Sequence, residues 1–157
     1  ILTECIRLIK GNKHRSKLLT YLSTDSFNRS IKNPKTSVDW LSKNEESNQA
    51  YLKDPFCQFI PTIPMYRSIF YFSNQVASKQ VIDEIPAQLP ILVISGQEDP
   101  LGENGKGIER FVKLLKASHS KVSVRVVEEA RHEILNEINR QDTYHFLADW
   151  MTKNMDV

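Results

Sequence analysis

The second half of the chain alternates between patterns typical of strands and patterns typical of helices. A continuous apolar run over residues 90–95 predicts a buried strand, and the alternation of Val122, Val124 and Val126 with polar residues predicts a second strand. Between them, apolar residues recur at helical spacing: Ile108, Phe111, Val112 and Leu115. A last helix is expected from about Gln141, with four apolar residues on one face: Phe146, Leu147, Trp150 and Met151. The order strand, helix, strand, helix predicts part of an α/β fold with parallel strands and crossover helices.

The residues before about position 85 show no such regular pattern. They are rich in Asn, Ser, Lys and aromatic residues and are interrupted by prolines, which predicts short helices joined by long loops. Helical pieces are expected over residues 1–8 and 18–22, and a longer helix from Pro64 to about Gln80. The longer helix carries an aromatic cluster: Tyr66, Phe70, Tyr71 and Phe72. We therefore expect a mainly helical cap or lid over residues 1–83 and the C-terminal part of an α/β core over residues 84–157.

Two parallel strands are too few to form a stable sheet. Parallel sheets are covered on both faces, and the strand around Ile91 to Ile94 would leave one edge of backbone groups unpaired. We expect this edge to pair with a missing N-terminal part of the same fold or with a second copy of the chain. The chain is therefore expected to be a piece of a larger α/β domain.

The composition and net charge of the chain exclude several classes of protein. The chain has 157 residues, 40% of them apolar and 25% charged, which excludes disordered, collagen-like and coiled-coil classes. A net charge of +2 gives no field strong enough to indicate nucleic acid as a partner. Two cysteines, Cys5 and Cys57, are too few for a disulfide framework, so we expect reduced, buried thiols and a cytoplasmic location.

The apolar runs are short, and the start of the chain has no leader-like pattern. No run approaches the ~20 residues that a membrane helix needs, so no integral membrane segment is expected. The first residues include Glu4 and lack a small-residue cleavage site, which argues against a signal peptide. The chain does not begin with Met, which suggests processing or a boundary within a longer sequence.

Candidate chemistry follows each predicted strand. Asp99 lies in the polar loop after the first strand, and His132 lies in the polar loop after the second. Because parallel strands joined by a crossover end at the same edge of a sheet, both side chains are expected at that edge. An Asp followed by a His in this arrangement fits the acid and the base of a Ser-His-Asp triad, in the chain order Ser, Asp, His that α/β-hydrolases have. The alternative is that Asp99 caps the turn before Pro100 and His132 is a surface residue.

Six short motifs, in order, carry a resemblance to a known family. They are Ser26-Phe27-Asn28, the run 35–42 (KTSVDWLS), Asp54-Pro55-x-Cys57, Ile94-Ser95-Gly96-x-x-Asp99-Pro100, Gly105-Lys106-Gly107 and Ala130-Arg131-His132-Glu133-x-x-Asn136-Glu137. From about residue 20 to its end, the chain resembles bacterial α/β-hydrolases of the lysophospholipase and monoacylglycerol-lipase-like group, also called serine aminopeptidase-like hydrolases.

The resemblance implies a fold and an activity. Asp99 would be the triad acid, His132 the triad base, and residues 1 to about 83 the cap over an acyl pocket. The complete protein would be a serine hydrolase cleaving carboxylic esters, with lysophospholipid or monoacylglycerol as the expected substrate. No cofactor is implied.

One departure from the family pattern concerns the nucleophile. The family places its serine in a G-x-S-x-G elbow before the cap. The five glycines here are Gly11, Gly96, Gly102, Gly105 and Gly107, and no two are four residues apart. We therefore expect the serine and the oxyanion hole upstream, and this chain alone to be inactive. The alternative function is a non-catalytic α/β-hydrolase-like module that binds lipid, itself or another protein.

Other candidates are weaker. The glycines at 102, 105 and 107 with Lys106 lack phosphate-loop spacing and predict a turn into the next helix. His14, His119 and His145 lack a second ligand at metal spacing, so we expect structural or solvated roles and no metal. Glu133 and Glu137 are expected to complement the dipole of the last helix. Phe27, Trp40 and the aromatic cluster fit either an acyl pocket or cap packing, so the substrate-binding residues are left unassigned.

Overall fold

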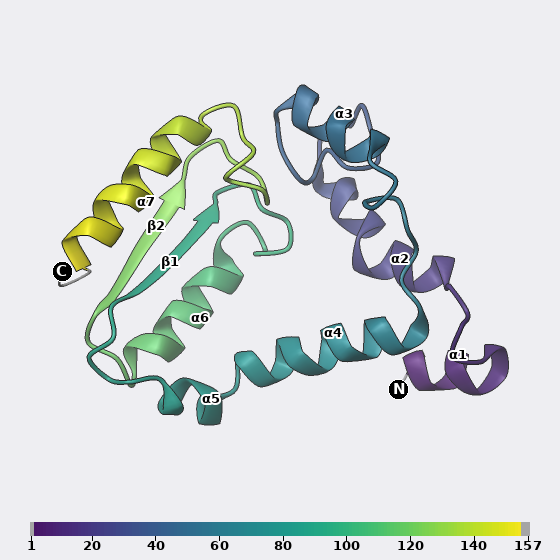
Figure 1. Ribbon diagram of the computed structural model, residues 1–157, viewed down its shortest axis with the longest axis horizontal. Coiled ribbons are helices and arrows are strands. Elements are labelled where there is room, and N and C mark those ends of the chain that lie inside the picture. Colours follow the sequence, from purple (N-terminus) through teal and green to yellow (C-terminus); the bar gives the residue numbers. More distant parts are fainter. Residues whose placement is uncertain (1, 155–157) are drawn as a thin grey trace.

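The computed structural model describes residues 2–154, and a small α/β part formed by residues 91–154 lies beside the N-terminal helices (Figure 1). The elements in order are α1 (Leu2–Lys10), α2 (Lys17–Ser23), the 3₁₀ helix η1 (Asp25–Ser30), α3 (Glu45–Lys53), α4 (Ile63–Val76), α5 (Lys79–Glu84), β1 (Ile91–Gly96), α6 (Lys106–Lys116), β2 (Val122–Val127) and α7 (Arg140–Asn154). The helix expected over residues 1–8 is α1, apart from Ile1, which lies outside the described residues.

The α/β part has the predicted order of strands and helices, but the first strand, predicted to be buried, is only half-buried over Ile91 to Ile94, because one of its edges has no strand beside it within residues 2–154. β1 and β2 pair in parallel, in register from Ile91 opposite Val122 to Gly96 opposite Val127. Helix α6 is the crossover between them, and α6 and α7 flank the two strands (Figure 1). Phe146 of α7 lies under the Arg125 guanidinium of β2, 5.2 Å from ring centroid to Cζ. Met151, expected on the packed face of α7, is instead exposed.

Local sequence explains where several helices begin. Ser16 accepts a hydrogen bond from the Leu19 amide and caps α2, and Asn44 accepts from the amides of Glu46 and Ser47 and caps α3. The prediction of a single helix from Pro64 to about Gln80 is wrong, because the structure has two helices there. The helix is broken after Val76, because the Ser78 side chain accepts from the Val81 amide and starts α5 as a separate helix.

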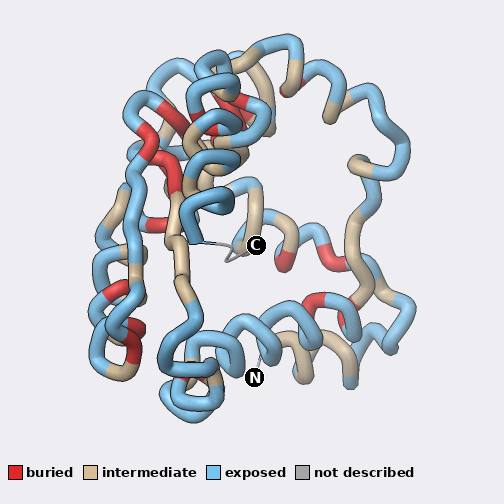
Figure 2. Tube along the Cα trace, turned by 60° about the vertical axis from the view of Figure 1, so that its left-hand side comes forward, coloured by how far each residue is buried: buried red, intermediate tan, exposed pale blue. Residues whose placement is uncertain are grey.

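The buried residues form several small groups (Figure 2). Leu19, Ile63 and Tyr66 form one group in the N-terminal helical part, with Ile6 packed against it. Of the predicted aromatic cluster only Tyr66 is buried, while Phe70, Tyr71 and Phe72 are exposed on α4. The expectation of two buried thiols is also wrong: Cys5 is exposed because α1 buries no residue completely, and Cys57 is half-buried.

The sheet consists of two strands within residues 2–154, so the edge of β1 that faces away from β2 has no strand beside it there (Figure 1). Over the same residues, no helix combines the length and the apolar character needed to cross a membrane.

Candidate active site

The loop after β1 holds Asp99 by its own backbone. The Leu101 amide donates to Asp99 Oδ1 at 2.9 Å, and the Asn104 amide donates to the Asp99 carbonyl at 2.9 Å. The chain then turns through left-handed backbone at Glu103, Asn104 and Gly105, with φ values of 54°, 51° and 94°, and enters α6. The turn predicted from the glycines is therefore confirmed, and it lies between Asp99 and α6.

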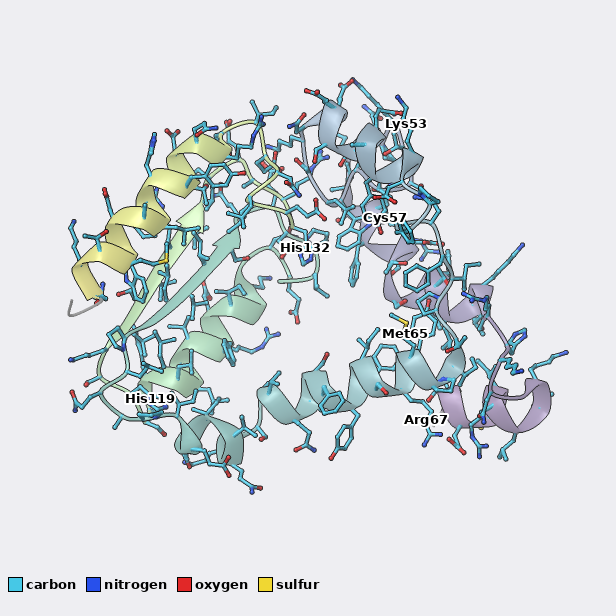
Figure 3. All side chains as sticks on the ribbon, viewed as in Figure 1. Lys53, Cys57, Met65, Arg67, His119 and His132 are labelled. Atoms are coloured by element: carbon cyan, nitrogen blue, oxygen red, sulfur yellow. The ribbon has the colours of Figure 1, made fainter. Side chains whose placement is uncertain are left out.

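His132 meets Asp99 at the carboxyl ends of the two strands. Nδ1 of His132 lies 3.0 Å from Oδ2 of Asp99, and the two side chains are 34% and 9% exposed, respectively. The His132 ring lies where the loop after β2 meets the N-terminal helical part (Figure 3). The structure thus brings together the two residues that strand order predicts at one edge. With Nδ1 directed at the carboxylate, Nε2 is the nitrogen available for proton transfer.

The pair stabilises its own charged form. Burial raises the pKa of Asp99, but hydrogen bonds from His132 and from the amides of Leu101 and Gly102 outweigh it and hold the pKa below its usual value. The hydrogen bond to Asp99 raises the pKa of His132 above its ordinary 6.5, against the opposing effect of burial. The stability that His132 gains from the pair is complete below pH 6.5 and is lost as pH rises through the higher, folded-state pKa. The contribution of Asp99 is present above its unfolded pKa of 3.8 and is lost as pH falls through its lower, folded-state pKa.

Removing the Asp99 charge is expected to lower the pKa of His132. In Asp99→Asn the ring loses both its charged acceptor and the Coulombic attraction that favours the imidazolium, so the pKa of His132 should fall to 6.5 or below. The ring proton shifts of His132, followed by NMR across pH 5 to 9, give this value. A pKa that stays at the wild-type value would mean that Asp99 and His132 do not interact in solution. Asp142→Asn, on the exposed first turn of α7, is the matched control and should leave the His132 titration unchanged.

Gly96 allows the two loops to approach closely. A Cβ atom at this position would lie 2.0 Å from the Arg131 carbonyl oxygen and 2.5 Å from the Ala130 carbonyl oxygen, which is closer than any side chain tolerates. The amide of Glu98 donates to the Ala130 carbonyl at 2.9 Å across the same contact. The absence of a side chain at Gly96 therefore sets the spacing between the Asp99 loop and the His132 loop.

The segment 39–44 packs along the His132 loop. The amide of His132 donates to the Trp40 carbonyl at 3.4 Å, and the amide of Glu133 donates to the Leu41 carbonyl at 2.7 Å. The Trp40 ring lies 5.1 Å from the His132 ring, centroid to centroid, and 5.1 Å from that of Phe27. An aromatic wall therefore flanks the imidazole, and it comes from the N-terminal helical part.

Glu137 differs from the sequence prediction. Its carboxylate was expected to complement the dipole of the last helix, but it accepts hydrogen bonds from the amides of Lys43, Arg131 and Ile138 instead. The physical reason is position: α7 begins three residues later, at Arg140, so the carboxylate lies outside its first turn. The same expectation is wrong for Glu133, which lies still further from the start of α7 and accepts from the Asn136 side chain at 2.8 Å. The sequence left Trp40 open between an acyl pocket and cap packing, and the structure places its ring beside His132. Sequence reasoning missed the contact of Glu137 with the His132 loop, although Glu137 lies within a motif that carries the family resemblance.

The remaining histidines lie elsewhere. His119 is buried at the far end of the α/β part, with Nε2 2.8 Å from the Ile82 carbonyl oxygen, so it joins α5 to the end of α6 (Figure 3). His145 is exposed on α7 and His14 is half-buried near α2. Across residues 2–154, no three or more His, Cys, Asp or Glu side chains form a group that could hold a metal ion.

A family model described as serine aminopeptidase, S33, matches residues 7–139. A solved structure of a highly thermostable carboxyl esterase from Bacillus coagulans in complex with glycerol superposes with a TM-score of 0.82 at 23% identity, covering 98% of this chain and 50% of that one. A structure described as a lipase in its open form gives a TM-score of 0.83 at 20% identity, covering 99% and 51%. No curated protein matches the chain significantly.

These likenesses show the fold, which is that of the α/β-hydrolases. The chain spans about half the length of each of the two solved structures.

Proposed function

Because the chain belongs to the serine aminopeptidase S33 family of α/β-hydrolases, we propose that it supplies the acid and the base of a serine-hydrolase triad, Asp99 and His132. The observation that carries the proposal is the 3.0 Å contact between His132 Nδ1 and Asp99 Oδ2 at the ends of two neighbouring parallel strands. The lowered pKa of Asp99 keeps it ionised, as the acid of a triad must be to hold the imidazole.

The proposed reaction proceeds in two steps. His132 Nε2 accepts the proton of a serine hydroxyl as the serine oxygen attacks the ester carbonyl, and the resulting imidazolium returns that proton to the leaving alcohol. In the second step Nε2 deprotonates a water that attacks the acyl-enzyme, and the proton passes to the serine as the acid leaves. Asp99 stays ionised throughout and fixes the ring so that Nε2 faces the reaction.

The nucleophile and the oxyanion hole are proposed to lie outside these residues. The sequence contains no G-x-S-x-G elbow, the motif that presents the serine in α/β-hydrolases. Turnover is therefore a property of the complete polypeptide, and the free edge of β1 is proposed to pair with the rest of that fold. Intact mass after treatment with a fluorophosphonate tests the location: the chain alone should stay unlabelled, whereas one adduct per chain would place an activated serine within it.

The proposed division of the chain follows from its two kinds of structure. Residues 1–83 are proposed as the cap and residues 84–157 as the C-terminal part of the core, supported by the change from helices to the β1–α6–β2 unit after α5.

The proposed substrate is a carboxylic ester with an acyl chain, such as a lysophospholipid or a monoacylglycerol. The aromatic wall of Trp40 and Phe27 beside His132 supports an apolar acyl group, because acyl pockets are lined by such side chains. We propose a cytoplasmic location, on the basis of the two free cysteines.

A substrate panel on the full-length protein tests the activity. We expect hydrolysis of a monoacylglycerol and of lysophosphatidylcholine, with kcat/KM rising by about threefold to fourfold for each additional CH₂ group placed against the apolar wall up to the pocket length. An aminoacyl p-nitroanilide, the amide expected of an aminopeptidase, is the comparison substrate. Faster turnover of the anilide would contradict the ester assignment, and no turnover of any substrate would favour the non-catalytic binding module, for which the free β1 edge is the supporting feature.

A further inference from the structure

The carboxylate of Glu137 is buried without an ion pair. The residue is only 1% exposed, and its side chain takes part in no salt bridge within residues 2–154. Burying a carboxylate is costly unless hydrogen bonds replace its hydration. Here backbone amides replace it: Oε1 accepts from Arg131 at 2.8 Å and from Lys43 at 3.0 Å, and Oε2 accepts from Lys43 at 3.0 Å and from Ile138 at 3.3 Å.

The amides that Glu137 holds come from both sides of the candidate site. Arg131 immediately precedes His132, so its amide fixes the backbone from which the imidazole projects. Lys43 lies in segment 39–44, which contributes the aromatic wall through Trp40. One oxygen, Oε1, binds both amides and therefore sets the distance between the two segments.

The contacts around Glu137 are consistent with this role. Arg131 Nη1 donates to the Asp39 carbonyl at 2.5 Å and to the Ser42 carbonyl at 3.2 Å, and Ser42 Oγ donates to the Asn136 carbonyl at 3.3 Å. These bonds run in both directions between segment 39–44 and residues 131–136. Glu137 and Arg131 both contribute a full charge to these contacts, and charge-assisted hydrogen bonds are about twice as strong as neutral ones. Glu137 is the one of the two whose side chain binds the backbone of both segments.

We propose that Glu137 is a positioning residue for His132: its buried carboxylate joins the backbone just before His132 to segment 39–44 and thereby holds the imidazole between Asp99 and Trp40. The expected effect on catalysis rests on the proposed function, in which His132 is the base. Glu137 does not touch the reacting atoms, so it acts through the placement of His132 and leaves substrate binding to other residues.

The amide isostere tests the proposal in the full-length protein. In Glu137→Gln one oxygen becomes an NH₂ group, which faces the backbone donors of Lys43 and Ile138 and repels them. We expect kcat for a short-chain p-nitrophenyl ester to fall by about 10- to 100-fold with KM near the wild-type value, the pattern of a misplaced base. The His132–Asp99 hydrogen bond should weaken, so the pKa of His132 should move down towards 6.5.

Glu128→Gln is the matched control, since it removes a carboxylate from the same loop at an exposed position. It should leave kcat and the His132 titration at wild-type values. If Glu137→Gln also leaves both unchanged, or changes only the melting temperature, the positioning role is wrong while the proposed function stands. If His132→Ala retains full activity, the proposed function fails, and the His132 titration in Glu137→Gln still decides the positioning role, because it does not depend on turnover.

Amide hydrogen exchange in the wild-type protein tests the same contacts without any variant, so the proposal can be tested even if Glu137→Gln does not fold. Amides bound to a buried carboxylate exchange slowly with solvent, so the amides of Arg131 and Lys43 should be far more protected than the exposed loop amide of Asn139. Equal exchange at all three positions would contradict the contacts of Glu137 and overturn the proposal.

Discussion

Replacing His132 with alanine is expected to lower kcat of the full-length protein for carboxylic esters by at least ~10⁴-fold, with little change in KM. His132 is the proposed base for both proton transfers, and its Nδ1 lies 3.0 Å from Asp99. Without the imidazole, the serine hydroxyl would have to attack while still protonated. Steady-state kinetics on a p-nitrophenyl ester, with circular dichroism to verify the fold, gives the result.

Two further variants make this test specific. His145→Ala removes an exposed imidazole from α7 and should retain the wild-type rate. Because Asp99 acts through His132, the double variant Asp99→Asn with His132→Ala should be no slower than His132→Ala alone. If His132→Ala retains its rate, the triad assignment is wrong; an additive loss in the double variant would mean that Asp99 has a separate role.

Substituting alanine for Gly96 is expected to lower the free energy of unfolding by ~3 kcal/mol and to reduce activity together with it. The added methyl group would lie 2.0 Å from the Arg131 carbonyl oxygen, which is backbone and cannot rotate away. The Asp99 loop and the His132 loop must therefore separate. Urea unfolding of the full-length protein measures the loss of stability.

Gly102→Ala provides the comparison for this prediction. A Cβ at Gly102 would meet its nearest neighbours at 3.5 and 3.6 Å, which are ordinary van der Waals distances. The free energy of unfolding of Gly102→Ala should differ from that of the wild-type protein by less than ~1 kcal/mol. Equal effects at Gly96 and Gly102 would mean that the loss reflects glycine replacement in general and not the close contact between the two loops.

The sequence predicts those parts of the fold that depend on side-chain periodicity. The apolar run before Ser95 and the alternation of Val122, Val124 and Val126 identify both strands, because β-branched and other apolar residues at these spacings favour extended backbone. Within the described residues the burial is less complete than the patterns predict, since Ile91 to Ile94 are half-buried and Val124 and Val126 are exposed. The proximity of Asp99 and His132 follows from the geometry of parallel strands, without any knowledge of the loops. Their catalytic role stays a prediction.

The parts that could not be predicted depend on backbone groups or on competing local signals. Segment 39–44 contacts the His132 loop mainly through carbonyls and amides, which every residue carries, so no side-chain pattern marks the contact. Glu137 matches the rule for acids near a helix start, yet its carboxylate binds loop amides. The break between α4 and α5 depends on one serine cap within a region that otherwise favours a helix.

The contacts of the site span very different lengths of chain. Asp99 and His132 are 33 residues apart and are joined by the single β1–α6–β2 unit, whereas Glu137 reaches Lys43 across 94 residues. Closing the longer loop costs about 0.9 kcal/mol more in chain entropy, on the logarithmic dependence of loop closure. During folding, the acid and base should therefore meet early, within a local unit, and the aromatic wall should arrive late. A newly made chain would pass through a state in which the imidazole is already oriented by Asp99 but still open to water on the side that Trp40 later covers.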